Sequence, residues 1–247
     1  MRQTDCYHRH VLEMLARDAA TRGVNLSEAQ IEQFECYLAL LSEWSERANL
    51  VGDVDPDVVQ RRHFAESIAL GAALRERQLL RGREDVLDVG AGAGFPGVPM
   101  KIAWPALRLT LIEATGKKTA FLSELVDRLG LDDVAVRSGR SEELAHDAGL
   151  RERFDLVVAR AVASLPALLE LTLPFARLGG RVVTPKGSRA AAEIAASSRA
   201  LQTLGGEAHS MPLSLPGPPQ TLVVIVKRRR TPAEFPRRSG VPVRSPL

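Results

Sequence analysis

The chain is poor in cysteine, in metal-ligand patterns and in long apolar runs, and each shortage excludes a class of protein. Its 247 residues include two cysteines, Cys6 and Cys36, outside any Cys-x-x-Cys motif, so neither a disulfide framework nor a zinc site is supported. The five histidines show no ligand spacing, and we expect no metal. No segment approaches the roughly 18 apolar residues of a membrane span, and the start lacks a signal peptide's apolar stretch. We therefore expect a cytoplasmic protein that uses no membrane.

Composition and charge point toward one domain with a basic end. Hydrophobic residues make up 45% of the chain, enough for one sizeable core. Residues 227–247 hold seven basic residues and one acidic residue, a net +6, whereas the preceding chain carries a net −3. This asymmetry indicates a polyanionic partner, with nucleic acid ahead of membrane because the segment has four prolines and no amphipathic helical pattern. The alternative is a solvated end that only keeps the protein soluble.

Residues 86–97, VLDVGAGAGFPG, carry the clearest sequence signal for function. A short apolar run is followed there by four glycines. Such a turn brings bare backbone up to a ligand, because side chains there would block the approach. Glu113 follows about 20 residues later at the end of the next apolar run, where an acid accepts hydrogen bonds from a ribose. The pattern favours a nucleoside-containing cofactor over a merely tight connection.

The glycines alone do not say which cofactor is bound. Gly92-x-Gly94-x-x-Gly97 matches the dinucleotide fingerprint, which keeps an NAD-dependent oxidoreductase as an alternative. Asp88, just ahead of the glycines, would repel a pyrophosphate but would suit the cationic methionine end of S-adenosylmethionine.

The chain divides into a helical first third and an α/β remainder. Ser27 and Gln30 form a capping-box pattern, and Asp55-Pro56 is typical of a helix start. After residue 84, apolar strands alternate with helical segments, which indicates a mostly parallel sheet. We predict strands near 85–89, 108–112, 133–137, 154–159 and 181–184, and helices near 97–103, 117–129, 164–177 and 188–204.

The end of the sheet separates the two cofactor classes. Residues 207–213 and 221–226 are apolar runs with too short a link for a helical crossover, so they should pair antiparallel. A doubly wound parallel sheet that ends in an antiparallel hairpin is typical of Rossmann-like class I methyltransferases. We expect this α/β fold, with a helical extension at 1–83, an S-adenosylmethionine-binding domain at 84–228 and a basic tail at 229–247.

Several motifs in this order resemble the RsmG (GidB) family of 16S rRNA guanine-N7 methyltransferases, from about residue 27 to the end. They are Asn49-Leu50, Arg62-His63-x-x-Glu66-Ser67, DVGAGAGFPG at 88–97, Glu113-x-x-x-Lys117-Lys118-x-x-Phe121-Leu122, Arg160-Ala161-x-Ala163-Ser164-Leu165, Pro185-Lys186-Gly187 and Phe235-Pro236-Arg237-Arg238-x-Gly240-x-Pro242.

The resemblance implies roles for individual residues in holding S-adenosylmethionine. Gly90 and Phe95 would contact its methionine and nucleoside portions, Ser141 and Glu142 would flank the adenine, and Arg160 would lie beside the cofactor at the end of the fourth strand. Without the resemblance, Ser141 and Glu142 would be interpreted as a helix cap and its first-turn acid. The expected cofactor-binding residues are Gly90, Gly92, Phe95, Glu113, Ser141, Glu142 and Arg160.

The implied chemistry explains the scarcity of acid–base residues. Guanine N7 has an available lone pair, so no proton has to be removed and we assign no catalytic residue. We expect RNA contacts from Arg62, His63, Lys186, Arg237 and Arg238, since arginine pairs with phosphates and stacks on bases. For His63 the alternative is a partly buried structural histidine. The expected partner is 16S rRNA or the small ribosomal subunit, bound by a monomer; a ribosome-associated RNA-binding protein with a regulatory cofactor pocket is the non-enzymatic alternative.

Overall fold

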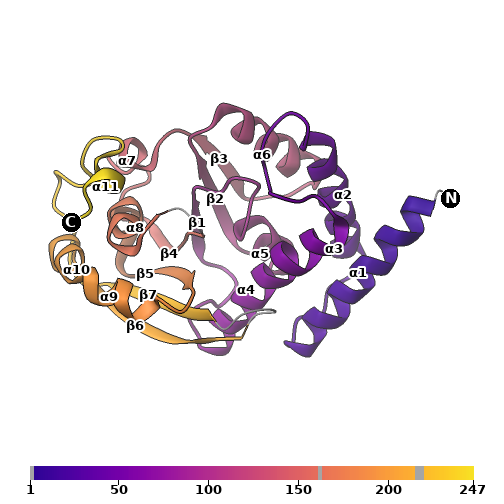
Figure 1. The fold of residues 1–247 in the computed structure, drawn as a ribbon, viewed down its shortest axis with the longest axis horizontal. Helices are drawn as coiled ribbons and strands as arrows, with labels where there is room; N and C mark the ends of the chain where they lie inside the picture. The colour runs from indigo at the N-terminus through magenta and orange to yellow at the C-terminus, as the bar shows by residue number, and fades with distance from the viewer. Residues whose placement is uncertain (1–2, 161–162, 215–219) are drawn as a thin grey trace.

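A seven-stranded sheet organises the computed structural model, which describes residues 3–160, 163–214 and 220–247. The strand order is β3-β2-β1-β4-β5-β7-β6. The first five strands are parallel, whereas β7 runs antiparallel to both β5 and β6, so the predicted fold class is confirmed (Figure 1). The strands are β1 (Asp85–Val89), β2 (Arg108–Glu113), β3 (Val134–Ser138), β4 (Phe154–Val158), β5 (Ala176–Lys186), β6 (Gly206–Leu213) and β7 (Gln220–Lys227).

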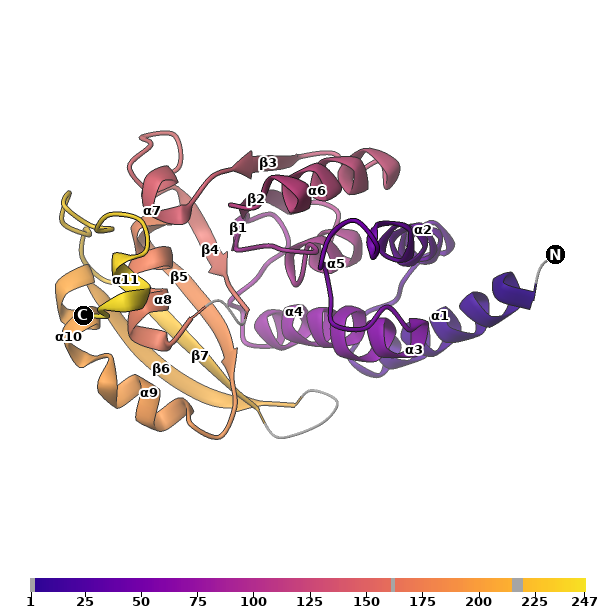
Figure 2. The same ribbon diagram turned by 45° about the horizontal axis from the view of Figure 1, so that its top comes forward.

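Helices cover both faces of the sheet, as Figures 1 and 2 show. Alternate residues of a strand point to opposite faces, and β1 supplies both layers. Val86 packs in one core with the helices α1, α2, α4, α5 and α6, whereas Leu87 and Val89 pack in the other with α8 and α10. The helices are α1 (Gln3–Thr21), α2 (Glu28–Trp44), α3 (Pro56–Val59), α4 (Glu66–Glu76), α5 (Gly97–Ala103), α6 (Gly116–Arg128), α7 (Ser141–Leu144), α8 (Leu165–Thr172), α9 (Ala190–Ala196), α10 (Ser198–Leu204) and α11 (Val241–Arg244).

The N-terminal helices begin where the capping patterns predicted. The Ser27 side chain accepts from the Gln30 amide while the Gln30 side chain accepts from the Ser27 amide, and Asp55 caps α3 ahead of Pro56. A π-helical turn, Gln60–Ala65, joins α3 to α4. Such turns are rare and often lie at functional sites. No helix of the described residues is long and apolar enough to cross a bilayer.

Two predicted helices were wrong in their bounds. The helix expected at 164–177 stops at Thr172 and is followed by a 3-10 turn, Leu173–Phe175, because Pro174 cannot donate a helical hydrogen bond. Strand β5 therefore begins at Ala176, ahead of the predicted 181, and a bulge against β4 accommodates the extra residues. The helix expected at 188–204 is two helices that meet at Ser197, whose hydroxyl donates to the Glu193 carbonyl.

The C-terminal arm, residues 228–247, folds back onto the sheet and α8. The Arg151 guanidinium donates to the carbonyl oxygens of Thr231, Pro232 and Phe235 at 2.9–3.0 Å. The Arg237 guanidinium binds both oxygens of Glu170 on α8, at 2.6 Å for the shortest contact, and the Glu170 side chain is fully buried. The arm is thus tied to the domain by buried polar contacts, which a merely solvated end would lack.

The arm offers a matched pair of neighbouring arginines for a stability test. Arg237→Met leaves the buried Glu170 carboxylate unpaired and should lower the free energy of unfolding by about 3 kcal/mol. Arg238→Met removes an exposed side chain and should change it by less than about 0.5 kcal/mol. Urea unfolding of the two variants checks this. Equal losses would show that the Glu170 ion pair does not hold the arm.

Candidate active site at the carboxyl ends of the parallel strands

The glycine turn after β1 is held by the neighbouring strand β2. The amides of Gly90 and Ala91 both donate to the Ile112 carbonyl, at 2.9 and 3.0 Å. Gly90 has φ +71°, in the left-handed region that glycine adopts without strain. A side chain at Gly97 would place its Cβ only 2.8 Å from an oxygen of Asp88. The turn therefore needs glycine for conformation at one end and for close approach at the other.

Asp88 is a fully buried carboxylate with an oxygen to spare. It lies on the same face of β1 as Val86, and its Oδ2 accepts from the Gly97 amide at 2.8 Å. Its Oδ1 has no hydrogen-bond partner among the described residues. Burial raises the pKa of Asp88 to about 7, against the lowering effects of the Gly97 amide and Arg160. A buried, unpartnered acceptor at the mouth of a glycine turn suits a cationic ligand group.

Glu113 at the end of β2 braces the same turn. Its Oε2 accepts from the Gly92 amide at 3.0 Å, and its Oε1 accepts from the Thr115 amide at 2.8 Å. The residue is 7% exposed. Each carboxylate oxygen can accept a second hydrogen bond, so these contacts leave capacity for the hydroxyls of a ribose.

Phe95 lies in a stack of rings from three parts of the chain. Tyr37 of α2 stacks on it with ring centroids 5.4 Å apart, and His63 of the π-helical turn stacks on it at 4.7 Å and 14°. The Tyr37 hydroxyl donates to the Ala93 carbonyl, which fixes the middle of the glycine turn. The N-terminal helices thus form one wall of the site.

Arg160 at the end of β4 joins this wall to the sheet. Its guanidinium donates to Glu66 Oε2 at 3.1 Å, to His63 Nδ1 at 2.7 Å and to the Arg62 carbonyl at 3.2 Å. Desolvation lowers the pKa of Arg160 and raises that of Glu66, while each one's charge opposes the shift of its partner. Because Glu66 balances the guanidinium, Arg160 adds little net positive charge to the site.

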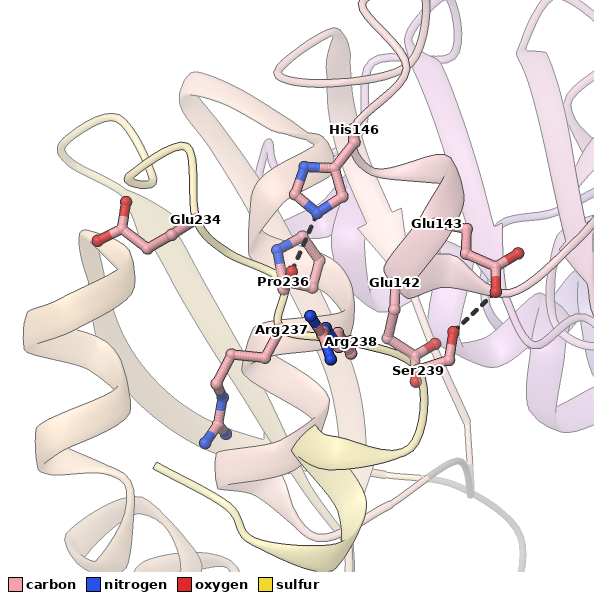
Figure 3. Close-up of a pocket in the computed structure, with 8 residues that line it drawn as sticks. All are labelled: Glu142, Glu143, His146, Glu234, Pro236, Arg237, Arg238 and Ser239. Carbon is pink, nitrogen blue, oxygen red and sulfur yellow. Dashed lines mark hydrogen bonds between the residues drawn. The ribbon is translucent and has the colours of Figure 1, made fainter.

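Ser141 and Glu142 open α7, and Glu142 contacts the C-terminal arm. The Ser141 hydroxyl donates to Glu142 Oε2 at 3.3 Å, and Glu142 Oε1 accepts from the Gly240 amide at 2.8 Å. Both residues are buried. A pocket of about 720 Å³ lies between α7 and the arm, and Figure 3 shows its lining side chains. They are Glu142, Glu143, His146, Glu234, Pro236, Arg237, Arg238 and Ser239.

The structure divides the expected RNA-binding cations into exposed ones and ones held in ion pairs. Arg62 and Arg238 are exposed. Lys186 instead donates to Glu193 at 2.9 Å and to the Ala163 carbonyl at 3.2 Å. Arg237 is held by Glu170, so its guanidinium serves the fold. The motifs include neither Glu193 of α9 nor Glu170 of α8. The sequence therefore did not predict that these carboxylates bind Lys186 and Arg237.

Other residues of the site had only weak sequence signals. Tyr37 belongs to none of the motifs, yet its ring stacks on Phe95 and its hydroxyl holds the glycine turn. Glu66 stands in the Arg62-His63 motif, and its spacing of three residues from His63 places both on one helical face. From that position, Glu66 could have been predicted as the partner of a cation in the site, which the structure shows to be Arg160.

Residues 30–221 match the GidB family, described as rRNA small subunit methyltransferase G. The ribosomal RNA small subunit methyltransferase G of Chloroflexus aggregans is 43% identical over 95% of this chain and 97% of its own, and that of Acetivibrio thermocellus is 39% identical over 95% and 96%. The chain belongs to this family. The resemblance inferred from the motifs is confirmed.

Solved structures support the same fold at low sequence identity. An O-methyltransferase from Bacillus cereus, in complex with SAH, has a TM-score of 0.53 at 18% identity and covers 77% of this chain and 90% of its own. A methyltransferase from Pyrococcus furiosus gives 0.52 at 13% identity, over 80% of this chain and 99% of its own. These likenesses bear on the fold alone.

The buried carboxylate predicts a pH dependence of stability. Because the pKa of Asp88 is about 7 in the folded protein and 3.8 in an ordinary carboxyl, the folded state binds the extra proton between these values. The free energy of unfolding due to this group therefore falls as pH rises from about 4 to 7. Asp88→Asn should lack this fall, so its stability relative to the unsubstituted protein should increase with pH.

Urea unfolding of both proteins at several pH values between 5 and 8 measures that difference. The titration of His63, whose pKa is lowered to about 4 chiefly by burial, acts in both proteins and cancels in the comparison. A difference that does not change with pH would contradict the assignment of Asp88 as the titrating group.

Proposed function

We propose that the protein transfers a methyl group from S-adenosylmethionine to N7 of a guanine in the 16S rRNA of the small ribosomal subunit. The observation that carries this is the buried Asp88 Oδ1, which has no hydrogen-bond partner in the described part of the chain and lies beside the glycine turn, in a chain that belongs to the small-subunit rRNA methyltransferase G family. A pyrophosphate would be repelled at this carboxylate, which speaks against an NAD-dependent oxidoreductase.

The residues present fit the cofactor by charge and by hydrogen bonding. Asp88 suits its cationic methionine end, and the spare acceptor capacity of Glu113 suits its ribose. The family resemblance assigns Gly90 and Phe95 to the methionine and nucleoside portions, and Ser141 and Glu142 to the adenine. The Gly240 amide of the C-terminal arm donates to Glu142. This residue therefore belongs both to the contacts of the arm and to the proposed adenine site.

The chain's contribution to the reaction is positioning and charge balance. Bound S-adenosylmethionine supplies an electrophilic methyl group, which the N7 lone pair accepts without loss of a proton. Well-oriented reactants gain on the order of 7–11 kcal/mol from proximity, so no general base is required. The purine becomes cationic as the methyl arrives, and the Arg160–Glu66 pair keeps this neighbourhood close to neutral.

RNA contacts come from two exposed cations at the rim of the site, Arg62 and Arg238. Lys186 contributes through its ion pair with Glu193. The Oε2 of Glu193 also accepts from the Leu165 amide, so this pair holds the start of α8. The protein works as a monomer in the cytoplasm. The non-enzymatic alternative, an RNA-binding protein with a regulatory cofactor pocket, differs from this proposal only in turnover.

The deciding experiment is incubation of the purified protein with methyl-labelled S-adenosylmethionine and 16S rRNA, both free and in small subunits. Label should appear as 7-methylguanosine at one position in an unpaired region, where the N7 edge can enter the site. Nucleoside analysis of the digested RNA measures this. Label found only in protein, in DNA or on a ribose hydroxyl would overturn the proposal, and binding without turnover would favour the non-enzymatic alternative.

The rim cations predict a change in the salt dependence of RNA binding. Arg62→Gln and Arg238→Gln should each lower the slope of log affinity against log salt by about 0.7, the loss of one phosphate contact on single-stranded RNA. Arg128→Gln, at the far end of α6 from the site, is the matched control and should leave the slope unchanged. Titrations at four salt concentrations decide the matter. Slopes that stay constant in both rim variants would remove these arginines from the interface.

A further inference from the structure

His63 presents one nitrogen of defined protonation. Its Nδ1 lies 2.7 Å from Arg160 Nη2. A guanidinium has donors and no acceptor, so Nδ1 must be the acceptor and carries no proton. The proton of the neutral ring is therefore on Nε2, and Nε2 has no hydrogen-bond partner among the described residues.

The ring is held in place from three directions. It stacks on Phe95 at 4.7 Å, and the guanidinium that binds it is itself fixed by Glu66 and by the Arg62 carbonyl. The π-helical turn places His63 beside the glycine turn. A donor whose direction is set before the substrate arrives loses little entropy when it makes its hydrogen bond.

The ring also stays neutral at working pH. Burial, Arg160 and Arg62 lower its pKa to about 4. A neutral donor adds no positive charge beside a base that becomes cationic. Since its free nitrogen already bears a proton, His63 cannot act as a general base.

We propose that His63 Nε2–H donates a hydrogen bond to O6 of the target guanine and so selects guanine over adenine. The inference rests on the proposed function, because methylation at N7 turns the N7 edge of the base toward the cofactor. On that edge guanine presents O6, an acceptor, next to N7, whereas adenine presents the N6 amino group, a donor. A fixed donor at His63 matches the first base and opposes the second.

The test varies the base and the side chain together. Splinted ligation gives rRNA, or subunits assembled from it, with guanine, inosine or 2-aminopurine at the methylated position. Inosine keeps O6 and lacks the 2-amino group, whereas 2-aminopurine keeps that group and lacks O6. The unsubstituted protein should methylate inosine as it does guanine, and its kcat/KM on 2-aminopurine should fall on the order of tenfold, the effect of one hydrogen bond.

Two substitutions at His63 complete the cycle. His63→Phe keeps a ring against Phe95 but has no donor, so its kcat/KM on guanine should fall on the order of tenfold with no further loss on 2-aminopurine. His63→Gln offers a carbonyl oxygen to Arg160 and an amide donor to the base, and it should regain most of the activity and the discrimination. The Kd for S-adenosylmethionine, measured by calorimetry, should stay unchanged in both.

Each result bears on the inference. Equal rates of the unsubstituted protein on guanine and 2-aminopurine would overturn it without any variant. A tenfold preference that persists in His63→Phe would assign the discrimination to another group, and loss of cofactor binding in that variant would give His63 a structural role. Failure of the unsubstituted protein to form 7-methylguanosine would instead defeat the proposed function, which separates the two outcomes.

Discussion

The hydrogen bond from the Gly97 amide to the buried Asp88 carboxylate is the contact on which the site depends. It ties the end of β1 to the start of α5 across the glycine turn, and it needs glycine at 97 because a Cβ would collide with the carboxylate. It also satisfies only one of the two oxygens. Under the proposed function, the other oxygen accepts the cationic end of the cofactor, so one residue would both close the turn and bind the ligand.

Arg160 is the second point of coupling, between the sheet and the N-terminal helices. Its partners His63 and Glu66 lie on the π-helical turn and on α4, so the helical extension supplies polar contacts to the site. A guanidinium beside a sulfonium and a purine that becomes cationic would be unfavourable if it were alone. The pairing with Glu66 resolves this, because Arg160 orients His63 while its charge is compensated.

The first strand, the glycine turn and the acid that braces it could be predicted from the sequence because their signals are local. Asp88, the glycines and Glu113 follow one another through a strand, a turn and a second strand, and their order indicates the class of nucleoside-containing cofactors. The contacts that join distant segments could not be predicted. Glu66 and Arg160 are 94 residues apart and Glu170 and Arg237 are 67 apart, and no periodicity relates such pairs. The bounds of α8 failed for a local reason, since the apolar run continued past Pro174 into β5.

The C-terminal arm shows why a count of basic residues overstates an RNA interface. Its charge suggested many phosphate contacts, yet Lys227 just before it is buried against Glu152 and the Leu173 carbonyl, Arg228 pairs with Glu207, and Arg237 pairs with Glu170. Burial lowers the pKa of Lys227 to about 8, which marks it as part of the interior. These cations hold the arm against the domain, where its Gly240 amide meets Glu142. Several of the basic residues therefore serve the fold, and Arg238 is the exposed one for which an RNA contact is proposed.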